Sequence, residues 1–355
     1  MKKLGKNILF FVILALMLSI PGLFMTSKFM ERNHLANGKN GVHAKLAVEP
    51  ADSLDVIVIG DSESYTSVSP MQLWKEYGFT TYAAGQPGAK LSETKSVLKT
   101  ALKKQKPKVV MLETNSLFRY ETVTNPAQNK ISNIAYKHLP LLKEHNVWKS
   151  PFMELRGKTY KGFAISSKVK PYNGGDYMMT TAKKMKVEET NIESLRDIKK
   201  MCDDSGAELV LYSAPSPKNY NFKKHNALSQ LAKNEGLKYL DLNTAVDEMG
   251  IDWSRDTRDK GDHLNCAGAE KTTEYIGSYL NENFELKDRH NEHIASTWNK
   301  LLKGYDKKFD KAKYKTRENA EIAFKNMKKV ELLPMTRQMC HEFYKGFQND
   351  QRYLR

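Results

Sequence analysis

The sequence predicts an α/β protein with a doubly wound parallel sheet of about five strands, an N-terminal transmembrane helix and a helical C-terminal extension. Short apolar, β-rich runs alternate with helical patterns through the middle of the chain. This alternation is typical of a parallel sheet covered by helices on both faces. An uncharged apolar segment lies near the N-terminus, and aromatic residues recur at helical spacing after the last strand candidate.

The N-terminal segment has the features of a membrane anchor. Lys2, Lys3 and Lys6 precede residues 8–25, which contain no charged residue. This length is near the roughly 20 residues that cross a bilayer as a helix, and it exceeds the roughly 7–15 apolar residues of a signal peptide. Lysines before the span favour a cytoplasmic N-terminus. We therefore expect residues 1–27 to form a cytoplasmic stub and a single-pass anchor in the cell membrane, with the rest extracytoplasmic; a cleaved signal peptide is the alternative.

Changes in composition divide the remaining chain. Residues 28–52 are polar and rich in Gly and Asn, and we interpret them as a stalk. Residues 53–285 are expected to form the main domain. The strand–helix alternation breaks at about 117–186, which predicts a cap or insertion near the site, because so long a stretch is not a plain connection. Residues 286–355 predict a basic helical C-terminal extension.

Five strand candidates and five helix candidates build the main domain. The strands are expected at 54–59, 79–83, 108–112, 208–213 and 238–242. The helices are expected at 91–105, 192–202 and 227–234, after Ser69, and from near Asn265. Ser69 is followed by Pro70 and by Gln72, the pattern of a capped helix N-terminus. Ligands of parallel sheets bind outside the carboxyl ends of the strands, so the residues that follow each strand are expected to carry the chemistry.

Charge and cysteine content limit the class of protein. The net charge is +16, and residues 286–355 hold 17 Lys and Arg against 9 Asp and Glu, a difference of +8. For an exported chain this favours anionic lipid or an acidic wall polymer over nucleic acid; solvated helix faces are the alternative. Cys202, Cys266 and Cys340 are odd in number and widely spaced, which excludes a small disulfide-stapled domain.

A candidate nucleophile follows the first strand candidate. Ser62 ends the sequence V-I-G-D-S, and a serine needs a base, a group that orients the base, and donors for the oxyanion. His263 follows the last strand candidate and would lie at the same edge of the sheet. Asp259 or Asp262 can orient the imidazole. We favour Asp259, because a side chain next to His263 in the sequence tends to point elsewhere.

Two further loops at this edge offer oxyanion donors. Residues 85–88 contain two glycines and follow the second strand candidate, and residues 113–115 follow the third and end in Asn115. A glycine lets a backbone N–H approach the substrate closely. The asparagine side chain supplies a further N–H donor.

Together these positions resemble the four blocks of the SGNH (GDSL-like) hydrolase superfamily, over roughly residues 53–283. The matching residues, in the order of the blocks, are Gly60-Asp61-Ser62, Gly88, Asn115 and His263. The resemblance implies a flavodoxin-like doubly wound sheet, the SGNH fold, with Ser62 as nucleophile and His263 as base. It also implies that the amide of Ser62, Gly88 and Asn115 form the oxyanion hole.

The sequence departs from the pattern of the superfamily at two places. The third block usually reads Gly-x-Asn-Asp, and here Glu113 and Ser116 replace its first and last members. The acid usually stands three positions before the histidine, where this chain has Lys260. These departures leave open which aspartate acts and motivate a non-catalytic alternative.

The anchor narrows the expected function. A single-span protein with such a domain is similar to membrane-anchored polysaccharide O-acetyltransferase accessory proteins of the alginate acetylation and teichoic acid D-alanylation types. This resemblance implies a multi-span membrane-bound O-acyltransferase as partner, and a Ser62 that passes an acyl group, expected to be acetyl, to a hydroxyl of an envelope polysaccharide or exopolysaccharide. The alternatives are a carbohydrate esterase or deacetylase with the same Ser-His-Asp set, and a scaffold that binds anionic polymer. No cofactor or metal is expected, because His263 and Cys266 offer only two of the usual four zinc ligands.

Overall fold

The computed structural model describes residues 2–24, 41–120 and 160–331 of the chain. A five-stranded parallel sheet with the order β2-β1-β3-β4-β5 forms its centre. The strands are β1 (Val56–Ile59), β2 (Thr81–Ala83), β3 (Val109–Glu113), β4 (Glu208–Ser213) and β5 (Lys238–Asp241). The prediction of a doubly wound parallel sheet of about five strands is confirmed, and each strand overlaps its predicted range.

Both faces of the central strands β1 and β3 are buried, which explains why these strands are nearly all apolar. Every residue of β1 and β3 is buried. Ile57 and Val110 belong to one hydrophobic cluster, while Val56 and Val109 belong to the other. Successive side chains of a strand point to opposite faces, so a sheet covered on both sides needs apolar residues at consecutive positions.

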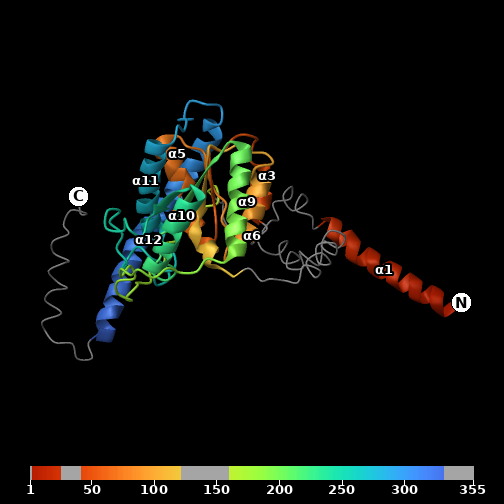
Figure 1. Cartoon of the computed structure of the whole chain (residues 1–355), viewed down its shortest axis with the longest axis horizontal. Helices are drawn as coiled ribbons and strands as arrows, with labels where there is room; N and C mark the ends of the chain where they lie inside the picture. Colours follow the sequence, from red (N-terminus) through yellow and green to blue (C-terminus); the bar gives the residue numbers. More distant parts are fainter. Residues whose placement is uncertain (1, 25–40, 121–159, 332–355) are drawn as a thin grey trace.

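Helices cover the two faces of the sheet (Figure 1). One layer contains α3 (Gly41–Val48), α6 (Leu91–Ala101) and α9 (Glu189–Ser205). The other contains α5 (Pro70–Tyr77) and α11 (Cys266–Asn283), which pack against each other.

The helix predicted at 227–234 is longer in the structure. α10 (Phe222–Glu235) begins earlier because the side chain of Asn221 accepts hydrogen bonds from the backbone N–H groups of Lys223 and Lys224. It ends at Gly236, which adopts the left-handed conformation common after helices. The early start brings Lys224 to the edge of the sheet where the candidate site lies.

The strand order reverses between β1 and β3. β2 lies on one side of β1 and β3 on the other, and in such sheets ligands bind at this switch point. The short helix α4 (Ser62–Ser67) begins after β1, and the 3₁₀ helix η2 (Thr114–Phe118) begins after β3. The residues that follow these two strands therefore flank the switch point.

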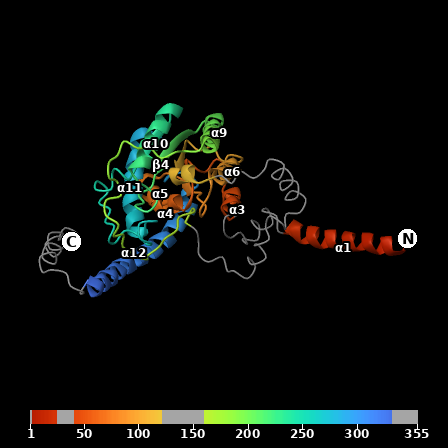
Figure 2. The same cartoon turned by 60° about the horizontal axis from the view of Figure 1, so that its bottom comes forward.

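The C-terminal helix is part of the core in its first half. α12 (Ala295–Glu331) buries Trp298, whose ring lies 5.3 Å from that of Trp74 between centroids. Tyr305 is also buried, and its hydroxyl accepts a hydrogen bond from Ser69 Oγ at 2.8 Å. Ser69 therefore connects α5 to α12 and makes no side-chain capping bond. Figure 2 shows the end of α12 extending past the α/β body.

The interval 28–52, predicted as a stalk, includes the helix α3. Its Leu46 is 1% exposed and belongs to a hydrophobic cluster of the body, and the side chain of His43 bonds to Thr100 on α6 at 2.9 Å. This part of the interval is thus attached to the domain through an apolar side chain that composition alone did not single out. Residues 25–40 lie outside the described residues.

The interval 117–186, predicted as an insertion, is described at residues 117–120 and from residue 160 onward. Tyr160 and Phe163 form an antiparallel bridge and are buried. The carbonyl of Lys161 accepts a hydrogen bond from the backbone N–H of Ala83 at 2.9 Å, so this loop lies along β2. Residues 121–159 and the tail at 332–355 lie outside the described residues.

α1 (Lys2–Phe24) contains most of the predicted anchor. Its large apolar side chains between Ile8 and Met17 are 40% to 67% exposed. The predicted span, 8–25, ends at a residue that lies outside the described part of the chain. Within the described part, no helix is both long enough and apolar enough to cross a membrane. Membrane anchoring stays a prediction.

Candidate active site

The end of β1 places Ser62 at the start of a helix. Gly60 has φ +143°, and a Cβ there would lie 2.6 Å from the Cβ of Glu113 on the neighbouring strand, so only glycine fits. Asp61 follows, and its carboxylate accepts a hydrogen bond from the backbone N–H of Glu63 at 3.0 Å. This cap turns the chain directly into α4, with the partly exposed Ser62 as its first residue.

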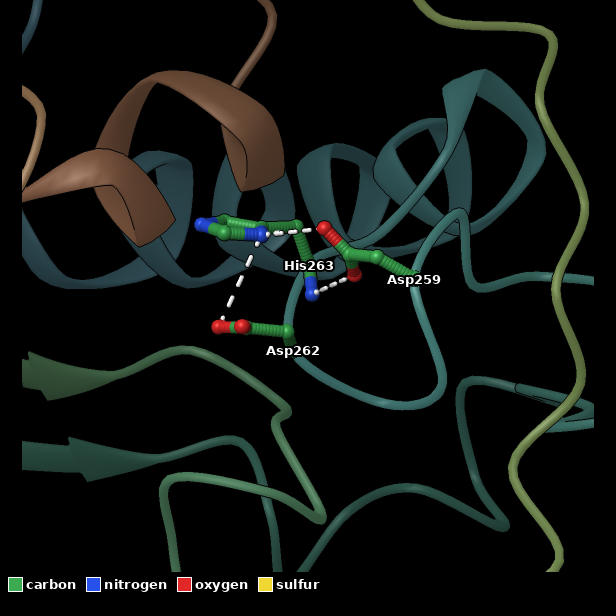
Figure 3. Close-up of side chains that lie close together, drawn as sticks. All are labelled: Asp259, Asp262 and His263. Atoms are coloured by element: carbon green, nitrogen blue, oxygen red, sulfur yellow. Dashed lines mark hydrogen bonds and ion pairs between the residues drawn. The ribbon is translucent and has the colours of Figure 1, made fainter.

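Ser62, His263 and Asp259 form one hydrogen-bonded chain. Ser62 Oγ lies 2.7 Å from His263 Nε2, and His263 Nδ1 lies 2.6 Å from Asp259 Oδ2. The backbone N–H of His263 also donates to Asp259 Oδ1 at 2.7 Å (Figure 3). Asp259 therefore contacts both the ring and the backbone of His263, whose other nitrogen faces the serine. In this geometry a histidine can take the proton of a serine hydroxyl.

Asp262 is the more distant of the two candidate acids. Its Oδ1 lies 3.6 Å from His263 Nδ1 (Figure 3). Its two carboxylate oxygens instead accept hydrogen bonds from Asn219 Nδ2 at 2.7 Å and from Lys218 Nζ at 2.6 Å. The structure thus brings Asp259, the aspartate that the sequence favours, into the shorter contact with the imidazole.

A tight turn explains how an acid four residues before the histidine reaches its ring. Lys260 and Gly261 both have positive φ, at 65° and 84°, and the N–H of Gly261 donates to Thr257 Oγ1 at 2.8 Å. Burial raises the pKa of Asp259, but hydrogen bonds from the side chain and backbone of His263 outweigh it, and the net pKa is lowered. Asp259 is therefore ionised at neutral pH and can stabilise an imidazolium.

Asn115 lies across the switch point from Ser62, and its backbone N–H and both polar atoms of its side chain have partners. Its backbone N–H donates to both carboxylate oxygens of Glu113 at 3.0 Å. Its side-chain Nδ2 donates to Asp61 Oδ2 at 2.9 Å, and its Oδ1 accepts a hydrogen bond from Lys224 Nζ at 3.0 Å. An amide nitrogen carries two hydrogens, so one serves Asp61 and the other can donate to an oxyanion.

The loop after β2 approaches the serine segment through Gly85. A Cβ on Gly85 would lie 1.9 Å from Ser64 Oγ, and the N–H of Gln86 donates to the carbonyl of Gly60 at 3.1 Å. Gly88 is exposed, has φ +58°, and a Cβ there would meet nothing within 4 Å. The close backbone approach expected of this loop thus occurs at Gly85, and the role of Gly88 as a donor stays a prediction.

Three buried acidic side chains gather next to Ser62. The carboxylates of Asp61, Glu63 and Glu113 have oxygens within 4.8 Å of one another. Burial raises the pKa of Glu63 to about 7, with a further contribution from the charge of Asp61. Burial also holds the pKa of Glu113 well above its usual range, and the charges of Glu63 and Asp61 add to the effect. Arg119 pairs with Asp61 and offsets part of this negative charge.

Two groups of side chains in the described part of the chain are spaced to hold a metal ion: the three carboxylates just described, and Asp259 with Asp262 and His263. Most of these groups already bond to protein donors. Sequence reasoning did not single out Glu63 or Lys224. Glu63 could have been identified from the sequence, because it is an acidic residue next to Ser62 in the segment that follows a strand. Lys224 lies in no recognisable motif, and the only sequence signal for it is that it follows β4.

No protein-family model and no curated protein matches this sequence. Solved structures similar to it include the following three. A protein described as lipolytic and of the G-D-S-L family, from Desulfitobacterium hafniense DCB-2, is 14% identical over 63% of this chain and 98% of that chain, with a TM-score of 0.38. A protein described as an acylhydrolase, from Bacteroides fragilis NCTC 9343, is 11% identical over 68% and 92%, with a TM-score of 0.36. A protein described as a platelet activating factor, from Streptococcus pneumonia, is 15% identical over 70% and 95%, with a TM-score of 0.28. At these identities and TM-scores, none of the three similarities determines the function of this chain.

Proposed function

We propose that this protein is a membrane-anchored, extracytoplasmic acyltransferase of the SGNH type. It moves an acyl group, acetyl by preference, through a serine acyl-enzyme to a hydroxyl of a cell-envelope polysaccharide or exopolysaccharide. The observation that carries the proposal is the hydrogen-bonded chain from Asp259 through His263 to Ser62. This chain supplies a nucleophile, a base and a group that orients the base.

The first half of the proposed reaction forms the acyl-enzyme. His263 Nε2 takes the proton of Ser62 as Oγ bonds to the acyl carbon of the donor. The N–H donors of Asn115 and of the Ser62 backbone stabilise the tetrahedral oxyanion. When the intermediate collapses, the bond to the leaving group breaks and His263 gives that group its proton. Asp259 stabilises the imidazolium without taking the proton.

The second half transfers the acyl group to the polysaccharide. The acceptor hydroxyl gives its proton to His263 and bonds to the acyl carbon, so a second tetrahedral oxyanion forms in the same place. Its collapse breaks the bond to Ser62 Oγ, which recovers a proton from His263. The same donors serve both intermediates, because both develop negative charge on the same oxygen.

The apolar surface of α1 supports the membrane-anchored form of the proposal. Its large side chains between Ile8 and Met17 are 40% to 67% exposed, and a continuous apolar surface of this kind is unfavourable in water. In the proposed arrangement residues 8–25 lie in the membrane, and a multi-span membrane-bound O-acyltransferase delivers the acyl group to the domain outside.

The test is the acyl content of the polysaccharide in cells that carry Ser62→Ala. We expect the ester content to fall to that of a deletion strain, and Ser296→Ala, which changes an exposed serine on α12, to behave as wild type. Acid-quenched wild-type protein should carry an acyl group on the Ser62 peptide by mass spectrometry.

Unchanged ester content in Ser62→Ala cells would overturn the enzymatic proposal in favour of a scaffold. Faster hydrolysis of acetyl esters than transfer to sugars would identify an esterase.

A further inference from the structure

We propose that Lys224 positions and polarises Asn115 as an oxyanion donor and is more than a counter-ion for the buried carboxylates. The inference rests on the proposed function, which gives Asn115 the oxyanion role. It assigns to Lys224 a positioning role in the same reaction.

The first observation concerns the hydrogen-bond partners of the Lys224 ammonium. Lys224 is 8% exposed, and its Nζ donates to Asn115 Oδ1 at 3.0 Å and to the backbone carbonyl of Asn219 at 2.6 Å. The same Nζ lies 4.6 Å from the ring centroid of Phe118. Asn115 and Phe118 belong to the two ends of η2, so one ammonium group contacts this short helix at both ends.

The second observation is that the partners of Asn115 permit only one orientation of its amide. The ammonium of Lys224 can only donate, and Asp61 Oδ2, which also accepts hydrogen bonds from Arg119, acts as an acceptor. Turning the amide over would set its NH₂ group against the ammonium and its oxygen against the carboxylate. Nδ2 is therefore held on the side of the residues around Ser62, and a donor held before the reaction needs no reorganisation when the oxyanion forms.

The lysine also strengthens the donor that it orients. A cation that hydrogen-bonds to an amide oxygen draws electron density away from the amide nitrogen, because chains of hydrogen bonds polarise one another. The effect is large where water is excluded, and Lys224 and Asp61 are both buried. The N–H of Asn115 that faces the oxyanion is thus a better donor than that of an asparagine in water.

A role in charge compensation alone does not account for the geometry. Asp61, Glu63 and Glu113 all lie near Lys224, and their charges oppose the lowering of its pKa by burial. Among the described residues Lys224 nevertheless forms no ion pair with a carboxylate and bonds to an amide and a backbone carbonyl. Asp61 pairs with Arg119 instead.

The test compares Lys224→Met with Lys223→Met in the full-length protein. Lys223 is the exposed neighbour on α10 and serves as the matched control. With p-nitrophenyl acetate we expect Lys224→Met to lower kcat roughly 10- to 100-fold with little change in KM, because loss of a whole oxyanion donor costs about 10²–10³. Labelling of Ser62 by a fluorophosphonate should slow to a similar extent. Lys223→Met should match wild type in both.

A double-mutant cycle separates positioning from general damage. In an Asn115→Ala background, Lys224→Met should change kcat by less than about twofold, since the group through which it acts is gone. An equal loss in both backgrounds would overturn the inference. Thermal unfolding checks that each variant is folded. If Lys224→Met does not fold, Lys224→Gln takes its place, because it removes the charge and can present either an N–H or an oxygen to Asn115; a wild-type kcat in that folded variant would likewise count against the inference.

Failure of the proposed function gives a different result. Wild-type protein with neither ester turnover nor fluorophosphonate labelling at Ser62 would overturn the proposed function and the positioning role with it. Wild-type activity that Lys224→Met leaves unchanged would overturn the positioning role alone.

Discussion

At the scale of single residues, the two aspartates near His263 differ in their partners. Asp259 bonds to the ring and backbone of His263, whereas Asp262 bonds to Asn219 and Lys218. We expect Asp259→Asn to lower kcat by roughly 10²–10⁴, because an amide no longer stabilises the imidazolium or selects its tautomer. Asp262→Asn should cost much less, as measured by turnover of p-nitrophenyl acetate. Equal losses in the two variants would contradict this assignment.

Glu63 should make stability depend on pH. Its pKa is raised to about 7 in the folded protein, from an ordinary value of 4.5. Between these values the unfolded chain has lost a proton that the folded protein still holds, so stability falls as pH rises from about 4.5 to about 7, and the loss is complete above that window.

Glu63→Gln removes this titration and keeps an oxygen that can accept the hydrogen bond from Asn219. We expect the variant to exceed wild type in free energy of unfolding by on the order of 1–3 kcal/mol at about pH 8, with a smaller difference near pH 5. Chemical denaturation at several pH values measures this. A difference that stays constant across the window would show that burial and the charge of Asp61 do not raise the pKa of this carboxyl.

At the scale of elements, α12 is bound to the body by buried aromatic side chains. Trp298 is 1% exposed and packs on Trp74, whereas Tyr314 on the same helix is 64% exposed. We expect Trp298→Ala to lower the free energy of unfolding by roughly 3–5 kcal/mol and Tyr314→Ala to change it by less than about 0.5 kcal/mol. Denaturant unfolding of both variants is the measurement. A neutral Trp298→Ala would mean that α12 does not contribute to the folding core.

At the scale of the whole molecule, the exposed apolar side chains of α1 lead us to expect the protein in the membrane. The full chain should stay in the membrane fraction after alkaline carbonate washing and be released by detergent. A variant that lacks residues 2–25 should appear in the soluble fraction, because the apolar surface between Ile8 and Met17 is gone. Wild-type protein in the soluble fraction would contradict anchoring.

The sequence by itself determined the class of sheet and the edge at which the candidate site lies. The central strands β1 and β3 are short, mostly apolar runs, and the polar residues Asp61-Ser62 and Thr114-Asn115 follow closely, so the pattern is local and can be read directly. Ser62, Asn115 and His263 could be selected for this reason, since each stands just beyond a strand or just before a helix. The preference for Asp259 over Asp262 also came from the chain, through the direction of neighbouring side chains.

Only the tertiary structure decided the contacts between distant segments. Gly85, not Gly88, packs against the serine segment, because the path of the loop after β2 depends on what it meets. Ser69 bonds to Tyr305 on a helix more than two hundred residues away, in place of capping its own helix. Lys224 meets Asn115 across 109 positions of sequence because α10 and η2 follow adjacent parallel strands. Such contacts depend on how all the strands, helices and loops pack together. A local pattern of residues holds no information about which distant residue will lie beside it.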